Sequence, residues 1–193
     1  MTAANQITLA RILLIPVFVG FALYYAHSVR DGHPDEALYW AAVATFAIAS
    51  LSDAVDGYVA RHFNQKSKLG VILDPLADKL LMLAAVCTLS FSAWPAKLPL
   101  YFVILSLSRE IFTVVGAFVI KFCAGKVHIE PHWTGKVSTL TQIIAISAAM
   151  LRLDNIVPTA TAIASVFVVS SGAIYIYEAY RQISAAAHHN NDA

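Results

Sequence analysis

The sequence predicts an all-α integral membrane protein with six transmembrane helices, and three observations lead to this fold class. The 193-residue chain is 59% hydrophobic and only 13% charged, whereas soluble domains carry about 25% charged residues. Its apolar residues gather in six runs close to the length of about 20 residues that a spanning helix needs. These runs do not alternate between polar and apolar residues and are too long for the strands of a membrane barrel, so helices are expected.

The six predicted spans follow one another along the chain, separated by polar or helix-breaking segments. They cover residues 7–27, 37–61, 69–93, 98–122, 135–151 and 158–180. An Arg–Asp–Gly–His–Pro sequence follows the first span and a Trp–Pro pair follows the third, and glycine and proline are common residues where helices end. We expect a single domain over residues 1–183, followed by a polar tail over residues 184–193.

The distribution of lysine and arginine predicts the orientation of these spans. Seven of these residues lie in the C-terminal tail and around the loops after the second and fourth spans, against three on the opposite side. Because cytoplasmic loops carry the excess of positive charge, both termini and these two loops are predicted to be cytoplasmic. The net charge of only +1 gives no long-range attraction to nucleic acid, and no nucleic-acid partner is expected.

Four aspartates lie inside apolar runs or at their ends, where a carboxylate costs about 2.5–3.5 kcal/mol at the centre of a membrane helix. Asp53 and Asp56 are three residues apart and Asp74 and Asp78 are four apart, so each pair shares a helix face. The polar turn between the two runs centres near Gln65. In an antiparallel hairpin folded there, Asp56 lies level with Asp74, and Asp53 lies level with Asp78.

Four converging carboxylates would repel one another strongly unless a cation lay among them. Ligation by oxygen alone favours Mg²⁺, Mn²⁺ or Ca²⁺ over zinc. The alternative, acids solvated in loops, suits Asp31 and Asp154 but does not suit four acids within apolar runs. The spacing therefore predicts a divalent metal site in the hairpin.

Small residues and one cation accompany these acids. Gly57 and Ala60 lie on the helix face of Asp53 and Asp56, and Arg61 follows directly. Small residues let a bulky ligand or another helix approach closely, so Gly57 is also compatible with a packing role, and Arg61 with a charge that reaches the membrane interface. Because Mg²⁺ is commonly held by carboxylates together with substrate phosphates, the combination favours a phosphate-bearing ligand.

The pattern over residues 53–78 resembles the signature of the CDP-alcohol phosphatidyltransferase family at every defined position. These positions are Asp53, Asp56, Gly57, Ala60, Arg61, Gly70, Asp74 and Asp78. The resemblance implies a six-helix membrane enzyme that transfers a phosphatidyl group from CDP-diacylglycerol to an alcohol. It further implies an active site open to the cytoplasm, a homodimer and the inner membrane of a bacterium.

The resemblance also implies roles for the residues of the signature. Asp53, Asp56 and Asp74 would ligate Mg²⁺ or Mn²⁺ in a two-metal site, and Asp78 would ligate metal or act as the catalytic base. The CDP group would be bound by Asp53, Gly57, Ala60, Arg61 and Gly70. The four acids are expected to titrate as a coupled group.

Three segments of the sequence bear on the identity of the acceptor alcohol. The Asn5-x-x-Thr8-x-x-Arg11 opening and the Ser108–Arg109–Glu110 segment are similar to family members that act on glycerol 3-phosphate, which is the expected acceptor. The segment at residues 135–139 has Ser138 where such members carry a second lysine, so it provides one fewer cation. It is partly similar to cardiolipin synthases, which use phosphatidylglycerol, so phosphatidylglycerol or another polyol remains an alternative.

Three cations are candidates for binding a phosphate on the acceptor: Arg109, Lys136 and Arg11. Arg109 lies within an apolar span, and its alternative role is pairing with a carboxylate of another helix, because neighbours such as Glu110 are not expected to face each other. Lys136 lies near a membrane boundary, where it would also fit a role in topology or headgroup binding. Lys79 is expected to balance the acidic cluster.

Two other classes of protein compete with a transferase. Intramembrane acids also mark ion pathways, so one is a cation transporter. A transporter is expected to show repeats or broken helices in corresponding halves, whereas this sequence shows no repeat and concentrates its acids in one hairpin. The other is a membrane scaffold with a degenerate site, which would have no reason to keep four buried aspartates.

Overall fold

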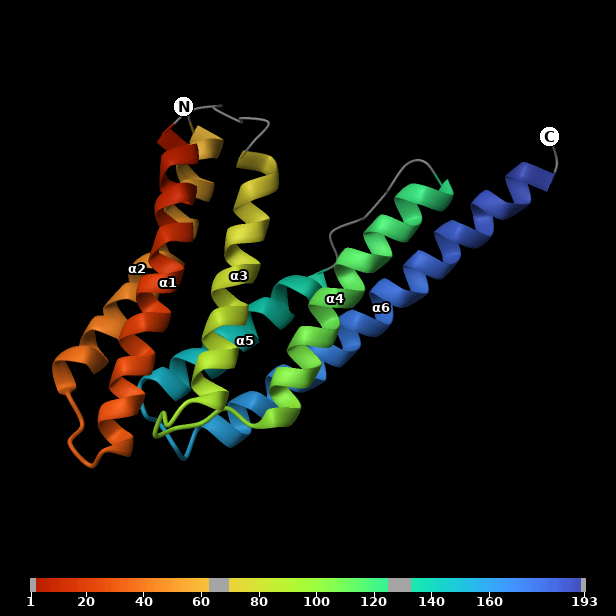
Figure 1. Cartoon of the computed structure of the whole chain (residues 1–193). Helices are drawn as coiled ribbons and strands as arrows, with labels where there is room; N and C mark the ends of the chain where they lie inside the picture. The colour runs from red at the N-terminus through yellow and green to blue at the C-terminus, as the bar shows by residue number, and fades with distance from the viewer. Residues whose placement is uncertain (1–2, 63–69, 125–132, 192–193) are drawn as a thin grey trace. The chain divides into compact units, whose positions relative to one another are not determined.

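The computed structural model of the chain confirms the all-α fold class: its described residues form six helices and no strand (Figure 1). The helices are α1 (Ala3–Arg30), α2 (Glu36–His62), α3 (Gly70–Phe91), α4 (Leu100–Ala124), α5 (Trp133–Met150) and α6 (Val157–Asn191). The structure describes residues 3–62, 70–124 and 133–191, with side chains at residues 8–52, 76–116 and 133–181. Each helix corresponds to one predicted apolar run, and α6 continues through most of the predicted polar tail.

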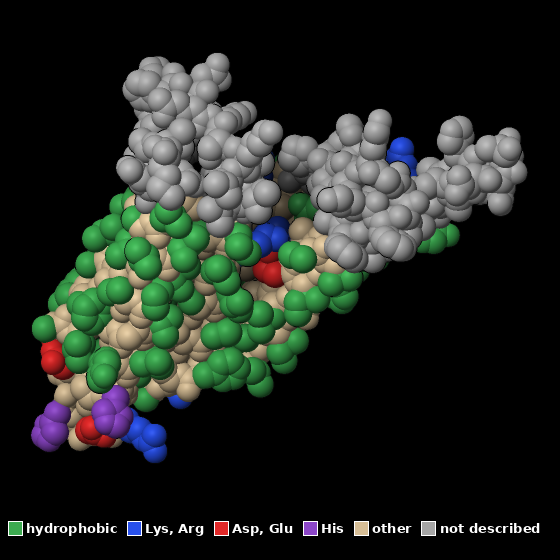
Figure 2. Space-filling view, turned by 45° about the horizontal axis from the view of Figure 1, so that its top comes forward, with side chains coloured by type: hydrophobic (Ala, Val, Ile, Leu, Met, Phe, Trp, Pro, Cys, Tyr) green, Lys and Arg blue, Asp and Glu red, His purple; other side chains and the backbone are tan. Residues whose placement is uncertain are grey.

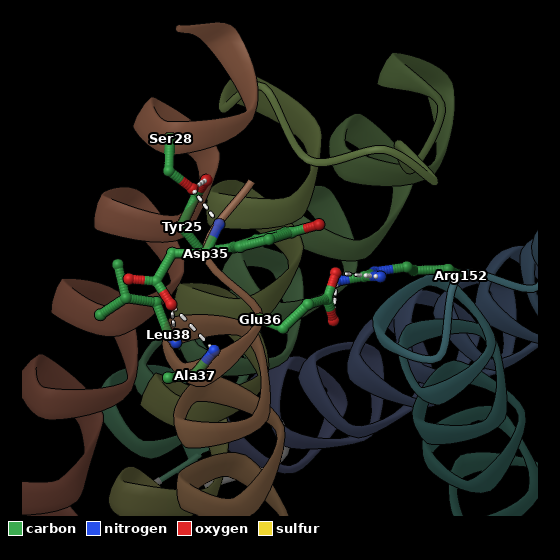
Figure 3. A network of polar contacts seen from close by, with 7 residues as sticks. All are labelled: Tyr25, Ser28, Asp35, Glu36, Ala37, Leu38 and Arg152. Atoms are coloured by element: carbon green, nitrogen blue, oxygen red, sulfur yellow. Dashed lines mark hydrogen bonds and ion pairs between the residues drawn. The ribbon is translucent and has the colours of Figure 1, made fainter. Parts of the chain in front are cut away.

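The ends of the helices follow local chemistry that the sequence signals. Asp35 caps the first turn of α2, since its Oδ1 accepts hydrogen bonds from the backbone N–H groups of Ala37 at 2.9 Å and Leu38 at 3.4 Å (Figure 3). The Ser28 hydroxyl donates to the Tyr25 carbonyl at 2.7 Å and accepts from the backbone N–H of Asp35 at 3.0 Å. These bonds fix the turn between α1 and α2.

The contacts divide the chain into two compact units. The first comprises Met1–Leu98 and Ala149–Asp154, and the second comprises Pro99–Ala148 and Asn155–Ala193. In the first unit α1 packs against α2 and α3, and α2 also contacts α3. The start of α1, the end of α2 and the start of α3 lie at the same end of this unit (Figure 1). In the second unit α4 packs along α6. The single domain over residues 1–183 stays a prediction.

The interior of the first unit combines aromatic rings with small residues. Phe18 of α1 is fully buried and its ring lies 5.5 Å from that of Phe46 of α2, measured between centroids. Ala22, Ala42 and Ala49 are completely buried around this pair. Such small side chains let helix backbones approach closely, which favours association where lipid competes for apolar surface.

Apolar side chains also cover the outer faces of the helices. Leu13 is 69% exposed and Ile111 is 58% exposed, and Figure 2 shows hydrophobic side chains spread over the visible surface. Within the described residues, Thr8–Arg30 and Val157–Arg181 are long and apolar enough to cross a membrane. Most of the surface of both helices is exposed, unlike the core helix of a soluble protein, so a bilayer is the fitting solvent. The number of spans and their orientation stay predictions.

A cluster centred on Arg152 stabilises the first unit at the end opposite the one where α2 ends and α3 begins. Arg152 binds Glu36 through both Nη atoms, at 3.0 and 3.1 Å (Figure 3). Its Cζ lies 3.5 Å from the centroid of the Tyr39 ring. Trp94 is 1% exposed, packs edge-on against Tyr25 at 4.9 Å and donates its indole N–H to the Ala149 carbonyl at 2.9 Å. The turn before α6 is thereby fastened to the start of α2.

Arg152 adopts a backbone conformation that is unfavourable for its residue type. Its φ angle is +57°, in the left-handed region, which costs about 1–2 kcal/mol for a residue with a Cβ. Burial is the largest single influence and would lower the pKa of Arg152, but the hydrogen bonds with Glu36 and the charge interactions with Tyr25, Glu36 and Tyr39 together outweigh it, and the pKa is raised. The side chain therefore stays charged, and its contacts compensate for the backbone conformation.

Replacing Arg152 should destabilise the first unit. We expect Arg152→Ala to lower the free energy of unfolding by about 1–2 kcal/mol, because a cation–π contact and a partly exposed ion pair are lost together. Glu36→Gln should cost less, since it removes only the ion pair. Thermal unfolding in detergent measures both, with Lys97→Ala at an exposed position as the control. Equal stability of Arg152→Ala and Lys97→Ala would contradict this role.

Candidate functional site

The backbone of the first unit carries the four predicted metal-binding aspartates on two neighbouring helices. Asp53 and Asp56 belong to α2, and Asp74 and Asp78 belong to α3. Asp53 precedes the last residue of α2 by nine positions and Asp78 follows the first residue of α3 by eight, so both lie about 12–14 Å from the same end of the unit. The convergence of their carboxylates stays a prediction, since the side chains of Asp53, Asp56 and Asp74 lie outside the described residues.

Asp78 is the one member of this set with a described side chain. It is half-buried, and both Asp78 and its neighbour Lys79 have polar or electrostatic partners within the structure. Among the described side chains no three His, Cys, Asp or Glu residues form a metal-binding group. The side chains predicted to bind the CDP group also lie outside the described set: Gly57, Ala60, Arg61 and Gly70.

Arg11 and Thr8 are both completely buried in α1. A buried cation in an apolar helix requires a polar or anionic partner, and both residues have partners within the structure. Arg11 follows the first residue of α1 by eight positions, which places its backbone about 12 Å from the end of the unit where α2 ends and α3 begins. Arg11 therefore shares its depth in the first unit with the predicted acidic cluster.

Arg109 and Glu110 form an ion pair in the second unit, between Nη1 of the arginine and Oε1 of the glutamate. The expectation that these neighbours would not face each other is wrong. Both side chains are long enough to bend along the surface of α4 and meet, and an arginine in an apolar helix strongly favours the nearest carboxylate. The Arg109 side chain remains only 10% exposed.

Polar atoms from α4 and α6 converge beside Gly135, in the first turn of α5. A Cβ placed on Gly135 would lie 3.3 Å from the Tyr175 hydroxyl oxygen, 3.7 Å from Nη2 of Arg109 and 3.8 Å from Oγ of Ser171. These three polar groups therefore lie close to Gly135 and to one another. We call Arg109, Gly135, Ser171 and Tyr175 the Arg109 cluster.

Several buried polar atoms near this cluster have no hydrogen-bond partner among the described residues. They are Oγ of Ser106, Nε of Arg109, Oγ1 of Thr134 and Oγ of Ser171. The three hydroxyl-bearing residues are each more than nine-tenths buried. An unpartnered buried polar group costs about 1–3 kcal/mol, and a polar ligand beside these atoms would relieve this cost. Arginine keeps its charge, and the positive end of α5 adds to it, so this ligand would be an anion.

The other candidate residues at the start of α5 differ in environment. Lys136 is exposed, whereas Ser138 is completely buried and its Oγ accepts a hydrogen bond from Nε2 of Gln142 at 3.2 Å. The sequence pattern indicated Arg109 and Lys136 as candidates but not Ser171 and Tyr175. The sequence does show two hydroxyl-bearing residues four positions apart in an apolar helix. This pattern alone does not indicate a binding site, because hydroxyls in such helices usually bond to the backbone of their own helix.

Comparison with known proteins gives one matching family and several similar chains. The family described as CDP-alcohol phosphatidyltransferase matches residues 1–176. The chain is 42% identical over 152 residues to the CDP-diacylglycerol–glycerol-3-phosphate 3-phosphatidyltransferase of Bacillus subtilis, covering 77% of this chain and 76% of that one. It is 32% identical over 185 residues to the probable phosphatidylglycerophosphate synthase of Mycobacterium tuberculosis, covering 93% and 82%. A cardiolipin synthase (CMP-forming) of Rattus norvegicus is 29% identical over 165 residues, covering 77% and 50%.

A side chain at position 135 should be tolerated less well than at other glycines of the second unit. A Cβ on Gly116 would meet nothing within 4 Å, so Gly116→Ala should raise the free energy of unfolding by about 0.5–1 kcal/mol through helix propensity. Gly135→Ala should lack this gain, because its Cβ would press on the Tyr175 hydroxyl. Unfolding in detergent compares the two variants, and equal gains would show that the cluster does not close around Gly135.

Proposed function

The chain belongs to the CDP-alcohol phosphatidyltransferase family, and we propose that it transfers the phosphatidyl group of CDP-diacylglycerol to glycerol 3-phosphate, with release of CMP. The observation that carries the chemistry is the set of four aspartates on α2 and α3, two neighbouring helices of one unit. The choice of acceptor is supported by the names of the relatives at 42% and 32% identity.

The donor set fits divalent metal. Four carboxylates on two helix faces supply oxygen ligands alone, which suits Mg²⁺ or Mn²⁺, and we infer that Asp53, Asp56, Asp74 and Asp78 hold two such ions. When bound, divalent metal neutralises the pyrophosphate of the CDP-lipid and improves CMP as a leaving group. Arg11 contributes to this site as a buried positive charge at the same depth in the unit. Its earlier candidate role, binding the acceptor phosphate, stays a prediction.

The remaining signature residues would bind the CDP group beside the acids. Gly57, Ala60 and Gly70 carry little or no side chain, which leaves room for a nucleotide against the helices. Arg61, near the end of α2, would pair with a phosphate oxygen. Asp53 would take part in both metal and CDP binding.

In the proposed reaction Asp78 acts on the acceptor hydroxyl. Its carboxylate accepts the hydroxyl proton while the acceptor oxygen forms a bond to the phosphorus on the lipid side of the pyrophosphate. The bond from this phosphorus to the bridging oxygen breaks, and CMP leaves with the electron pair. Because the four acids are coupled, the pH dependence belongs to the group and not to one residue.

The acceptor would be held by cations of the second unit. Arg109 is nearly buried, permanently charged and paired with Glu110 through Nη1, while its Nη2 lies beside Gly135, so we infer that it binds the phosphate of glycerol 3-phosphate. Lys136 is exposed at the start of α5, where it would attract the same phosphate. A cardiolipin synthase activity with phosphatidylglycerol as acceptor is the second candidate, favoured by Ser138 at a position where a lysine is expected for a phosphate monoester.

The membrane topology and the assembly of this enzyme are part of the same proposal. We infer six membrane spans, with both termini and the active site on the cytoplasmic side of a bacterial inner membrane, and a homodimer as the working assembly. The exposed apolar faces of the helices support lipid contact, and the excess of lysine and arginine supports the orientation.

The proposed reaction is tested by CMP release from purified protein in detergent with CDP-diacylglycerol and Mg²⁺ or Mn²⁺. Glycerol 3-phosphate, phosphatidylglycerol and inositol phosphate are offered in separate reactions. We expect CMP with glycerol 3-phosphate, and its loss on chelation with recovery when metal is returned. Release with phosphatidylglycerol alone would establish the second candidate, and no binding of CDP-lipid by folded protein would refute the transferase.

Loss of the proposed base should separate turnover from binding. Asp78→Asn should lower the rate of CMP release by about 10²–10⁴-fold, because the acceptor hydroxyl loses its proton acceptor. Binding of CDP-diacylglycerol should survive better in Asp78→Asn than in Asp53→Ala or Asp74→Ala, which lack a metal ligand. Asp154→Asn in the exposed α5–α6 turn is the matched control. Near-normal turnover in Asp78→Asn would exclude it as the base.

A further inference from the structure

The Arg109 cluster contains two hydroxyls that the proposed function has not yet used. We propose that Ser171 and Tyr175 of α6 determine acceptor specificity by donating hydrogen bonds to the phosphate of glycerol 3-phosphate beside Arg109. In this chain the two neutral hydroxyls take the place of a second cation. The inference rests on the proposed function for the identity of the acceptor.

Ser171 differs from the other hydroxyl residues of α6. Ser165 donates to the Thr161 carbonyl at 2.7 Å and Ser170 donates to the Val166 carbonyl at 2.7 Å. Each of these hydroxyls is satisfied by its own helix, as is usual in apolar surroundings. Ser171 is completely buried, yet its Oγ has no hydrogen-bond partner among the described residues. Its hydroxyl is therefore available for a ligand.

The second unit also shows what a purely structural pair of hydroxyls looks like. The hydroxyls of Tyr101 on α4 and Thr161 on α6 lie 3.0 Å apart and bridge the two helices. Thr161 additionally donates within its own helix, to the Val157 carbonyl at 2.8 Å. At the Arg109 cluster the hydroxyl oxygens of Ser171 and Tyr175 instead lie beside Gly135, and among the described residues neither makes a hydrogen bond that joins two helices.

The geometry of the cluster suits a tetrahedral anion. Ser171 and Tyr175 are four residues apart and therefore share one face of α6. Their oxygens and Nη2 of Arg109 all lie within 4 Å of the point where Gly135 would carry a Cβ. Donor groups from two helices therefore lie near one another beside Gly135, and hydrogen bonds to a charged acceptor such as phosphate are roughly twice as strong as neutral ones.

The chemistry of α5 explains why hydroxyls are needed. Ser138 stands where a second phosphate-binding lysine is expected, and its hydroxyl is already occupied by Gln142 inside the protein. The first turn of α5 therefore offers the exposed Lys136 and the positive end of the helix, but no buried cation. Arg109 alone cannot surround a phosphate monoester, so the α6 hydroxyls complete its coordination.

The test measures binding of glycerol 3-phosphate by equilibrium dialysis with full-length protein in detergent. Ser171→Ala and Tyr175→Phe each delete one hydroxyl without changing the shape of the side chain. We expect each to raise the Kd about ten-fold or more, the effect of one hydrogen bond to a charged group, with no change in affinity for CDP-diacylglycerol. The KM for glycerol 3-phosphate in the CMP assay should rise in parallel, with little change in kcat.

Two matched controls on the same helix exclude a general effect of removing a hydroxyl. Ser170→Ala deletes a hydroxyl bonded to its own helix, and Tyr177→Phe deletes one from a side chain that is 67% exposed. Both should bind glycerol 3-phosphate like the unmodified protein. Neither Ser171→Ala nor Tyr175→Phe should have a lower thermal unfolding midpoint in detergent than the two control variants, so that a binding defect is not a folding defect.

The outcomes separate this inference from the proposed function. If the unmodified protein releases CMP with glycerol 3-phosphate but Ser171→Ala and Tyr175→Phe match the controls, the inference is wrong and the proposed function stands. If the two variants alone lose glycerol 3-phosphate binding while no acceptor supports CMP release, the inference stands and the proposed function fails. An unmodified protein that does not bind glycerol 3-phosphate overturns the inference.

Discussion

The cost of placing polar groups among apolar helices governs this structure. Helices satisfy the hydrogen bonds of their backbone internally, so only the polar side chains still need partners. The described residues show two ways in which these side chains find them. Most hydroxyls bond to a carbonyl one turn back on their own helix, as Thr45 and Ser165 do. Charges are neutralised in pairs, with Arg109 bound to Glu110 and Arg152 bound to Glu36. A group that follows neither solution is a candidate for ligand binding.

This constraint explains why the candidate chemistry divides between the two units. The first unit carries the four aspartates on α2 and α3 together with the buried Arg11, a set dominated by acids that suits metal and pyrophosphate. The second unit carries the Arg109 cluster, a set dominated by donors that suits a phosphate. A phosphatidyl transfer requires both kinds of site, one for the activated donor and one for a phosphorylated acceptor.

The sequence predicted the helices well because long apolar runs and their polar breaks are local features. It also indicated Asp78, whose position in an apolar run is unusual by composition alone. It could not predict the Arg152 cluster, because Arg152 and Glu36 are 116 positions apart and nothing local to Arg152 signals a φ angle of +57°. It missed Ser171 because only the structure distinguishes a hydroxyl bonded to its own helix from one that is not. For the side chains of Asp53, Asp56 and Asp74, the sequence remains the guide.

Neutral donors have a physical advantage over a lysine at the acceptor site. A cation that is buried in the absence of phosphate must either lose its hydration or pair with a carboxylate. Glu110 is already paired with Arg109. A hydroxyl left without a partner costs only about 1–3 kcal/mol, and this cost is relieved when phosphate binds. Two hydroxyls on α6 therefore add affinity for a phosphate monoester without requiring a second counter-ion in an apolar helix. Such an arrangement keeps the acceptor site stable when empty and reserves its strongest contacts for the ligand.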